Sequence, residues 1–265
     1  VLRQLDHRGI PRLVEALETG SGRTRALWLV MERIDGVTLA DHLMDHRYDA
    51  DEVLDVIQGV AALLAWLHDR SPPVVHRDVK PGNVLRRPDG GFALVDFGAV
   101  RDVLRDELGG STVAGTFGYM APEQFAGDAS PRTDVYGLGA LAVTLLTREP
   151  PHTLQDRTGR LQWRGRARHP ADVADLIDAM LAPEPQARPS AREVVDRVAA
   201  LKARPRRAPM PDGPPSTSAS TSTRTSPTTP AMPQRELPIP RSQTRGRRLA
   251  LATRTRRCPR PGDEA

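Results

Sequence analysis

Four short motifs indicate which chemistry this chain could perform. His76-Arg77-Asp78 is followed by Asn83, five residues after the aspartate, and then by Asp96-Phe97-Gly98 and Ala121-Pro122-Glu123. Carboxylate and amide oxygens are the hard ligands that Mg²⁺ prefers. Taken together, the order and spacing of the motifs indicate a site that holds magnesium, a phosphate and a hydroxyl nucleophile along one line.

Short strands are predicted beside these motifs. Val84-Leu85 and the run from Phe92 to Val95 are typical of strands, and Asp89-Gly90-Gly91 between them is typical of a turn. The aspartates and the asparagine of the motifs would then lie at strand ends, where the backbone is firm and the side chains face a cleft.

The remaining elements follow from hydrophobic periodicity and capping signals. Residues 134–147 are apolar on almost all sides, so this helix should be buried. The other predicted elements are strands at 13–17 and 26–31, a short helix capped by Thr38 and running through His46, helices at 51–67 and 171–181, and a helix opened by a capping box of Ser190 with Glu193.

The motifs resemble those of the eukaryotic-type (Hanks-type) serine/threonine protein kinases, and the chain looks bacterial. The resemblance extends from Val1 to about Lys202. It implies an α+β fold of the protein-kinase kind, with an incomplete N-terminal β lobe and a mainly α-helical C-terminal lobe. The implied organisation is a kinase domain at 1–203, divided into a small-lobe remnant at 1–31, a hinge at 32–36 and a large lobe at 37–203, followed by a disordered basic tail at 204–265.

The resemblance implies a role for each polar residue of the catalytic loop. Asp78 would orient the substrate hydroxyl and accept its proton, and Lys80 would place a positive charge near the γ-phosphate of ATP. Asn83 and Asp96 would bind Mg²⁺. A lysine two places after the aspartate, together with Thr116, favours Ser or Thr over Tyr as the acceptor. The implied cofactors are therefore ATP and Mg²⁺.

Residues 115–123 resemble the end of an activation segment. Thr116 would contact the aspartate and the lysine of the catalytic loop. Glu123 would pair with Arg188, 65 residues later, inside the helical lobe. Asp134 would accept hydrogen bonds from the backbone of the catalytic loop and brace it.

The adenine ring would be bound at the hinge. Backbone groups of Glu32 and Ile34 would meet its edge, and Met31 would be the gatekeeper residue. Leu39 and Leu85 would touch the ring.

The resemblance also implies structural and regulatory residues. His76 would belong to an apolar stack with Phe97 and Leu2. Arg77, which precedes the catalytic aspartate, would be neutralised and ordered by a phosphate on the activation segment. The candidate acceptors of that phosphate are Ser111 and Thr112.

Three further parts of the kinase pattern are not found in these residues. They are a glycine-rich loop, a lysine on the third strand and a glutamate on the helix that follows it. Leu2 to Asp6 resembles the last turn of that helix, and the first residue is Val1 rather than methionine, which is typical of a truncated record. We therefore expect the stretch alone to be inactive and the full gene product to be a kinase.

The charge of the chain is unevenly distributed. From Arg204 onward, 13 arginines and four acids give a net charge of +9, so residues 1–203 carry −4 of the total of +5. The tail also holds twelve of the 25 prolines. Because no aromatic residue interleaves with its arginines to stack on bases, we expect a disordered tail and no nucleic-acid binding.

Composition also indicates a compartment. The single cysteine, Cys258, excludes an intramolecular disulfide and a cysteine-rich zinc site, which fits a reducing, cytoplasmic environment. The longest apolar runs fall short of the roughly 18 residues that a membrane span needs. Related kinases often carry a membrane helix beyond such a tail, so the parent protein could still be anchored.

Two alternatives remain beside a protein kinase. The missing elements favour a non-catalytic, kinase-like interaction module, whereas the intact Asp78, Lys80, Asn83 and Asp96 oppose it. A small-molecule phosphotransferase of the aminoglycoside or choline kinase type would share the catalytic residues, but would not be expected to carry the Ala-Pro-Glu motif. The expected partners are proteins with Ser or Thr acceptors, and dimerisation or trans-autophosphorylation is left open.

Overall fold

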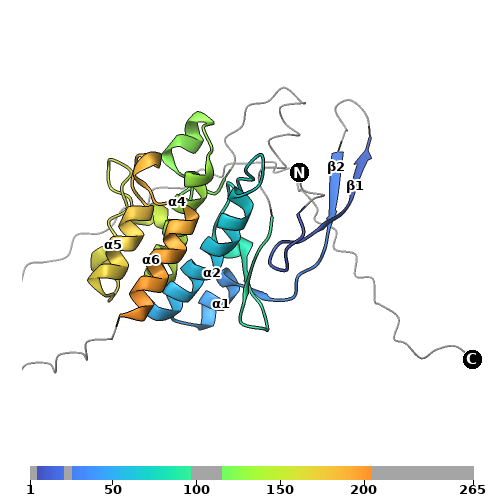
Figure 1. Ribbon diagram of the computed structural model, residues 1–265. Helices are drawn as coiled ribbons and strands as arrows, with labels where there is room; N and C mark the ends of the chain where they lie inside the picture. Colours follow the sequence, from blue (N-terminus) through green and yellow to red (C-terminus); the bar gives the residue numbers. More distant parts are fainter. Residues whose placement is uncertain (1–4, 21–25, 97–114, 205–265) are drawn as a thin grey trace, which may run out of the picture. The chain divides into compact units, whose positions relative to one another are not determined.

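The computed structural model describes residues 5–20, 26–96 and 115–204, which form short β-strands and a group of packed helices (Figure 1). The predictions made for Leu2, Phe97, Gly98, Ser111 and Thr112 lie outside the described residues, as does the basic tail beyond Arg204. The α+β fold class predicted from the sequence is confirmed.

The first two strands form an antiparallel hairpin. β1 (Leu13–Thr19) pairs with β2 (Ala26–Met31), with an irregularity in register between Leu13 and Glu15. Near the far end of the hairpin the indole nitrogen of Trp28 donates to Thr19 Oγ1 at 2.9 Å. Both strands lie where the sequence predicts them.

A second sheet carries the candidate site. β3 (Val37–Thr38), β4 (Val84–Arg86) and β5 (Phe92–Leu94) are antiparallel, with β4 in the middle. The backbone N–H of Val95 donates to the carbonyl oxygen of Asn83 at 2.9 Å, which continues the β4–β5 pairing one step further. The catalytic-loop asparagine is thereby fixed beside the residue that precedes Asp96.

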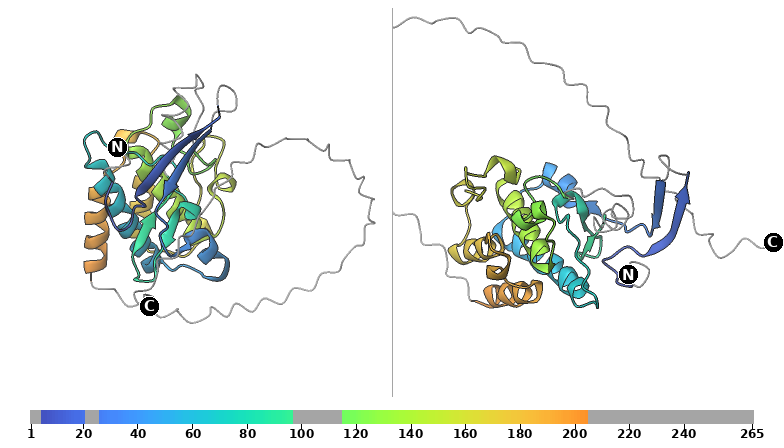
Figure 2. Two further views of the ribbon diagram at one scale, coloured as in Figure 1. Left: turned by 90° about the vertical axis from the view of Figure 1, so that its right-hand side faces the viewer. Right: turned by 90° about the horizontal axis from the view of Figure 1, so that it is seen from above.

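The helices form the main core. α2 (Ala50–His68) packs against both α4 (Pro131–Thr147) and α6 (Ala191–Ala203), and α4 also packs against α5 (Ala171–Met180) (Figures 1 and 2). All residues of α4 from Thr133 to Leu145 are buried, which confirms the prediction from its uniformly apolar sequence. The α-helices are α1 (Leu39–Asp45), α2 (Ala50–His68), α4 (Pro131–Thr147), α5 (Ala171–Met180) and α6 (Ala191–Ala203), and the 3₁₀ helices are η3 (Pro81–Asn83), η4 (Pro122–Ala126), η5 (Pro151–Thr153), η6 (Arg164–Arg166) and η7 (Pro185–Ala187).

Two of the three predicted helix caps are found where the sequence places them. The side chains of Thr38 and Ser190 cap α1 and α6. However, α2 begins at Ala50, one residue before Asp51. The side chain of Asp49 accepts hydrogen bonds from the N–H groups of Asp51 and Glu52, and the side chain of Glu52 accepts one from the Asp49 N–H. This capping box satisfies more backbone donors than a start at Asp51 would.

A glycine in α2 lets the second sheet approach closely. A Cβ atom placed on Gly59 would lie 2.3 Å from the ring of Phe92 at the start of β5, so a larger residue would require this ring to shift. The close packing of the Phe92 ring on α2 therefore depends on glycine at this position.

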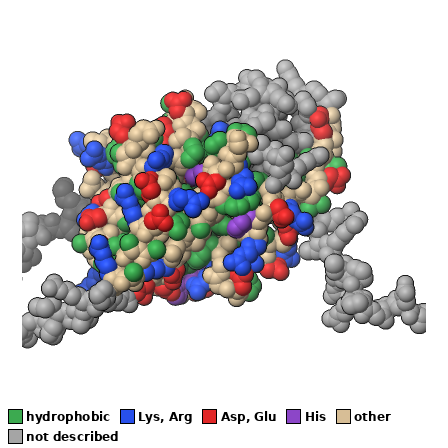
Figure 3. Space-filling view, viewed as in Figure 1, with side chains coloured by type: hydrophobic (Ala, Val, Ile, Leu, Met, Phe, Trp, Pro, Cys, Tyr) green, Lys and Arg blue, Asp and Glu red, His purple; other side chains and the backbone are tan. Residues whose placement is uncertain are grey.

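The surface of the helical face in Figure 3 interleaves acidic and basic side chains without a large apolar patch. None of the described helices is both long and apolar enough to cross a membrane.

The cap of α2 gives a stability test. Replacing Asp49 with Ala removes two hydrogen bonds to the first turn, so we expect a loss of about 1 kcal/mol in the free energy of unfolding. Asp128→Ala, at an exposed position outside any helix, is the matched control. Equal midpoints of urea unfolding for both variants would contradict the assigned cap.

Candidate active site

The catalytic loop is held by one buried carboxylate. Asp134 in α4 is only 1% exposed. Its Oδ2 accepts the backbone N–H of His76 at 2.8 Å, and its Oδ1 accepts the N–H of Arg77 at 2.7 Å. His68, the last residue of α2, lies with Nε2 at 2.9 Å from Oδ2 of the same carboxylate. Asp134 therefore joins two helices to the loop, and the bracing implied by the resemblance is present.

The carbonyl group of Arg77 is held by a residue of η4. Arg77 has a φ of 68°, a left-handed conformation that non-glycine residues adopt at a cost. The amide of Gln124 in η4 donates to the Arg77 carbonyl at 2.9 Å and accepts the N–H of Ala121 at 3.0 Å. The unusual backbone is thus stabilised by partners on both of its peptide groups.

His76 links the loop to the second sheet. Its ring is fully buried, and burial lowers its pKa although the nearby charge of Asp134 acts in the opposite direction. A neutral ring with the proton on Nε2 satisfies both neighbours, since Nε2 lies 3.0 Å from the Val95 carbonyl and Nδ1 accepts the N–H of Asp78 at 3.3 Å. Phe97 and Leu2, the expected stacking partners of His76, lie outside the described residues, so the stack stays a prediction.

Three predicted site residues surround the carboxylate of Asp78, itself the fourth. Lys80 Nζ lies 2.6 Å from its Oδ2, and the hydroxyl of Thr116 donates to its Oδ1 at 2.9 Å. Lys80 Nζ is also 2.7 Å from Thr116 Oγ1. The amide nitrogen of Asn83 donates to the carbonyl oxygen and to Oδ2 of Asp78 at 2.9 and 3.0 Å. These bonds fix the position of the Asp78 carboxylate, and the ammonium group of Lys80 compensates its negative charge.

The same contacts test whether Mg²⁺ fits. Because the side-chain nitrogen of Asn83 donates to Asp78, its Oδ1 is the atom left to bind a metal ion. Asp96 follows Val95, whose N–H bonds Asn83, and its side chain is exposed. An amide oxygen and a carboxylate one step apart across a strand pair are a donor set that suits Mg²⁺.

Glu123 and Arg188 form a two-point ion pair inside the helical lobe. The distances are 2.6 Å from Nη1 to Oε1 and 2.9 Å from Nη2 to Oε2. The Arg188 side chain is fully buried and also donates to the carbonyl oxygens of Ala182, Pro183 and Arg132. Burial raises the pKa of Glu123, but the hydrogen bonds and charge of Arg188, a backbone hydrogen bond and the hydroxyl of Thr133 together outweigh it, so the net shift is downward.

The residues expected to contact the nucleotide differ in their exposure and in their hydrogen bonds. The N–H of Glu32 already donates to the Arg12 carbonyl at 2.8 Å, which leaves its carbonyl side as the group to meet a ligand. Ile34 and Leu85 are half-buried. Leu39 has no exposed surface and belongs to the hydrophobic core, so the structure corrects the prediction that it touches the adenine ring. Leu39 is the first residue of α1 and directly follows β3, and its side chain packs into the core.

Comparison with known proteins decides the family. The model of the protein kinase domain matches residues 1–198. The chain belongs to the protein kinase family.

Relatives of this kinase domain are serine/threonine-specific by name. It is 34% identical to serine/threonine-protein kinase C of Synechocystis over 194 residues, which cover 69% of the chain and 35% of that relative. It is 41% identical to PknL of Mycobacterium tuberculosis over 129 residues, covering 48% and 32%, and 36% identical to the receptor-like kinase ALE2 of Arabidopsis thaliana over 162 residues, covering 60% and 21%. The kinase domain therefore resembles the Hanks-type enzymes and spans about a third or less of these relatives' lengths.

Two residues that support the kinase site, Gln124 and His68, are not predicted by the sequence. Gln124 follows directly after Ala121-Pro122-Glu123, but nothing in its local pattern shows that its amide reaches Arg77, 47 positions earlier. His68 lies at the end of a helix, 66 positions before its partner Asp134. Only the folded kinase domain shows such long-range contacts.

The pKa of Glu123 predicts a pH dependence of stability. Because folding depresses this pKa below its usual value of 4.5, the pair's contribution is present above that pH and is lost as the pH falls through the folded value. Glu123→Gln should cost about 3–5 kcal/mol at neutral pH, since it leaves Arg188 buried without its counter-charge. It should also flatten the decline in stability below pH 4.5.

Thermal unfolding of the two proteins between pH 3 and 7 measures both effects. The exposed Glu184→Gln is the matched control for removal of one negative charge. If the Glu123 and Glu184 variants unfold alike at neutral pH, the ion pair contributes nothing to stability.

His68 gives a second test. His68→Leu removes a donor to Asp134 and should lower the free energy of unfolding by about 1–3 kcal/mol, since a buried acceptor loses a partner. His68→Gln keeps a donor and should lose less. Native-state hydrogen exchange of the His76 and Arg77 amides would report whether the loop loosens, and unchanged protection in the Leu variant would argue against the bracing role.

Proposed function

We propose that the gene product containing this kinase domain transfers the γ-phosphate of ATP to Ser or Thr hydroxyl groups of proteins. The observation that carries the proposal is the cluster of Lys80, Asn83 and Thr116 around the carboxylate of Asp78. A solvated surface carboxylate would not need three side-chain partners that come from two separate segments. The serine/threonine specificity in the relatives' names supports the choice of acceptor.

Each residue of the cluster has a task in the transfer. The acceptor hydroxyl hydrogen-bonds to Asp78, its oxygen attacks the γ-phosphorus, the bond from phosphorus to the ADP oxygen breaks, and the hydroxyl proton passes to Asp78. Lys80 Nζ, 2.6 Å from the carboxylate, can stabilise the negative charge that spreads over the phosphate oxygens. Mg²⁺, held by Asn83 and Asp96, would supply further neutralisation of that charge.

The kinase pattern includes three parts besides the residues of this cluster. These 265 residues contain neither a glycine-rich phosphate loop nor the third-strand lysine and helix glutamate of the kinase pattern. We infer that the stretch by itself does not transfer phosphate. Since Cys258 is its only cysteine, we also assign the reaction to a reducing, cytoplasmic compartment.

The test compares two aspartates in the full gene product. Asp78→Asn removes the base but keeps the side-chain shape, and should lower kcat for Ser/Thr protein substrates by about 10²–10³-fold with Mg²⁺ and ATP present. Asp128→Asn, on the exposed surface, should retain wild-type activity. Equal rates for the two variants would contradict the role of Asp78. A wild-type protein that transfers no phosphate would instead fit a non-catalytic, kinase-like module.

A further inference from the structure

Three arginines from separate segments act on the side chain of His7. Arg8 is its neighbour in sequence, Arg70 follows the end of α2, and Arg87 lies in the turn between β4 and β5. The guanidinium group of Arg87 donates to the carbonyl oxygen of Arg8 at 2.8 Å, which joins this turn to the N-terminal segment. We call His7 and the three arginines the arginine cluster.

The indole ring of Trp66 in α2 positions two members of the cluster. The ring centroid of His7 lies 4.9 Å from that of Trp66, and the guanidinium carbon of Arg70 lies 4.3 Å from the same centroid. The Nε atom of Arg70 also donates to the Trp66 carbonyl oxygen at 3.1 Å. These contacts hold both side chains in place before a ligand binds, so binding costs less conformational entropy.

Several hydrogen-bond donors of the cluster remain available to a ligand. His7 Nδ1 accepts the N–H of Gly9 at 3.1 Å, so the proton of the neutral ring lies on Nε2. Arg8 is exposed, and its guanidinium group has no hydrogen-bond or ion-pair partner among the described residues. The bond from Arg70 to the Trp66 carbonyl oxygen uses only Nε, which leaves the two terminal nitrogens.

The cluster has an excess of positive charge. Its one ion pair within the described segments joins Arg87 Nη2 to Asp89 at 3.0 Å, and this carboxylate is 45% exposed, so solvent screens it. Burial lowers the pKa of His7, and the charges of the three arginines lower it further. Residues 1–203 together carry −4, so the cluster differs in sign from the domain around it. An anion is the ligand that this charge favours.

We propose that the arginine cluster binds the phosphoryl group of a phosphorylated serine or threonine side chain on a protein partner. Such a group carries about −1.5 to −2 charges at pH 7 and has three strong acceptor oxygens. Guanidinium groups bind phosphate oxygens through paired N–H donors, and the His7 Nε2–H adds another donor. A carboxylate carries only one negative charge, so it should bind less tightly.

Two other anionic ligands fit the cluster less well. A single-stranded nucleic acid would stack bases on an aromatic ring, but His7 and Arg70 already contact the ring of Trp66. A membrane surface holds proteins through apolar side chains as well as through charge. None of the large hydrophobic side chains that are exposed in the described residues belongs to segments 6–10, 66–70 or 87–91, which form the cluster.

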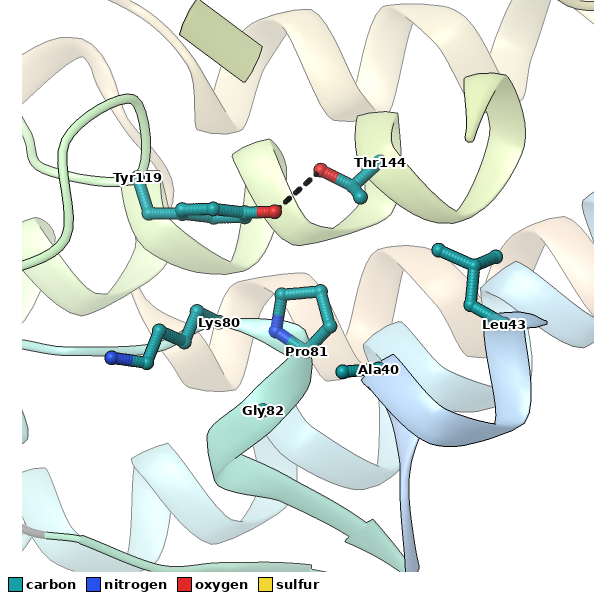
Figure 4. A pocket seen from close by; sticks show the side chains of 7 residues that line it. All are labelled: Ala40, Leu43, Lys80, Pro81, Gly82, Tyr119 and Thr144. Atoms are coloured by element: carbon teal, nitrogen blue, oxygen red, sulfur yellow. Dashed lines mark hydrogen bonds between the residues drawn. The ribbon is translucent and has the colours of Figure 1, made fainter. Parts of the chain in front are cut away.

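The arginine cluster is separate from the acceptor site. A hollow of about 240 Å³ adjoins the acceptor site, and Figure 4 shows Lys80 at one end of this hollow and Leu43 at the other. The lining of the hollow contains no residue of the arginine cluster. The side chains that hold Asp78 do not belong to the cluster either. A phosphorylated partner and an acceptor hydroxyl therefore do not compete for the same residues.

The test uses the full gene product without ATP or Mg²⁺, so that no transfer takes place. Fluorescence anisotropy gives its affinity for three labelled peptides of one sequence that carry phosphoserine, glutamate or serine at the same position. We expect the phosphoserine peptide to bind about tenfold more tightly than the serine peptide, with glutamate between them. NMR of ¹³C-labelled histidine should show that the phosphoserine peptide raises the pKa of His7, because an adjacent anion favours the protonated ring.

Arg8→Gln assigns the binding to the cluster. Its guanidinium group has no partner in the described residues, so the substitution removes a charge and no contact that the fold needs. It should weaken binding of the phosphoserine peptide about tenfold and leave the serine peptide unchanged. Arg157→Gln is the matched control, because it removes the same charge from an exposed position in the turn between Gln155 and Leu161. The control should change neither affinity.

The outcomes decide between the possible ligands. Equal affinities for the phosphoserine and serine peptides overturn the inference, and so does an Arg8→Gln variant that binds like the Arg157→Gln control. Inorganic phosphate that competes as strongly as the phosphoserine peptide overturns the assignment to a side chain, as does Arg8-dependent binding to phosphatidylserine vesicles in place of the peptide. Since every readout is binding without transfer, these results leave the proposed phosphoryl transfer untouched.

Discussion

The catalytic loop depends on the carboxylate of Asp134. A charge that is 1% exposed is tolerable only when donors surround it, and here they are the backbone N–H groups of His76 and Arg77 together with the His68 ring. The same bonds stabilise the left-handed backbone at Arg77, which would be unfavourable in a free loop. Because Asp134 lies in α4, whose residues are buried from Thr133 to Leu145, the position of the loop is set by the packing of the helical core.

A second polar network positions the other half of the site. Arg188, fully buried, fixes Glu123, and the neighbouring Gln124 reaches back to the Arg77 carbonyl. Thr133, next to Asp134, donates to Glu123 at 2.9 Å, so the two networks share the first turn of α4. The segment that carries Thr116 is therefore anchored to the same helix as the catalytic loop. Contact between Thr116 and Asp78 then follows from the shared support rather than from local sequence.

Local patterns predict the elements and the motif residues of this chain well. The burial of α4 follows from its apolar composition, and the contacts of Asp78 with Lys80 and Asn83 arise within one short loop. The partners of Asp134 and Arg77 in α2 and η4 are distant in sequence, so no periodicity indicates them. An apolar residue near a hinge, such as Leu39, can serve a core or a ligand equally well by sequence, and its zero exposure in the structure assigns it to the core.

The central claim is that this scaffold directs Asn83 and Asp96 at a divalent cation opposite Asp78. A crystal structure of the full gene product with Mn²⁺ and a non-hydrolysable ATP analogue tests it most directly, because the anomalous signal of manganese locates the ion independently. The account predicts a peak bonded to Asn83 Oδ1 and the Asp96 carboxylate, with the γ-phosphate between it and Asp78. An ion held by other residues, or either side chain directed away from it, would contradict the account.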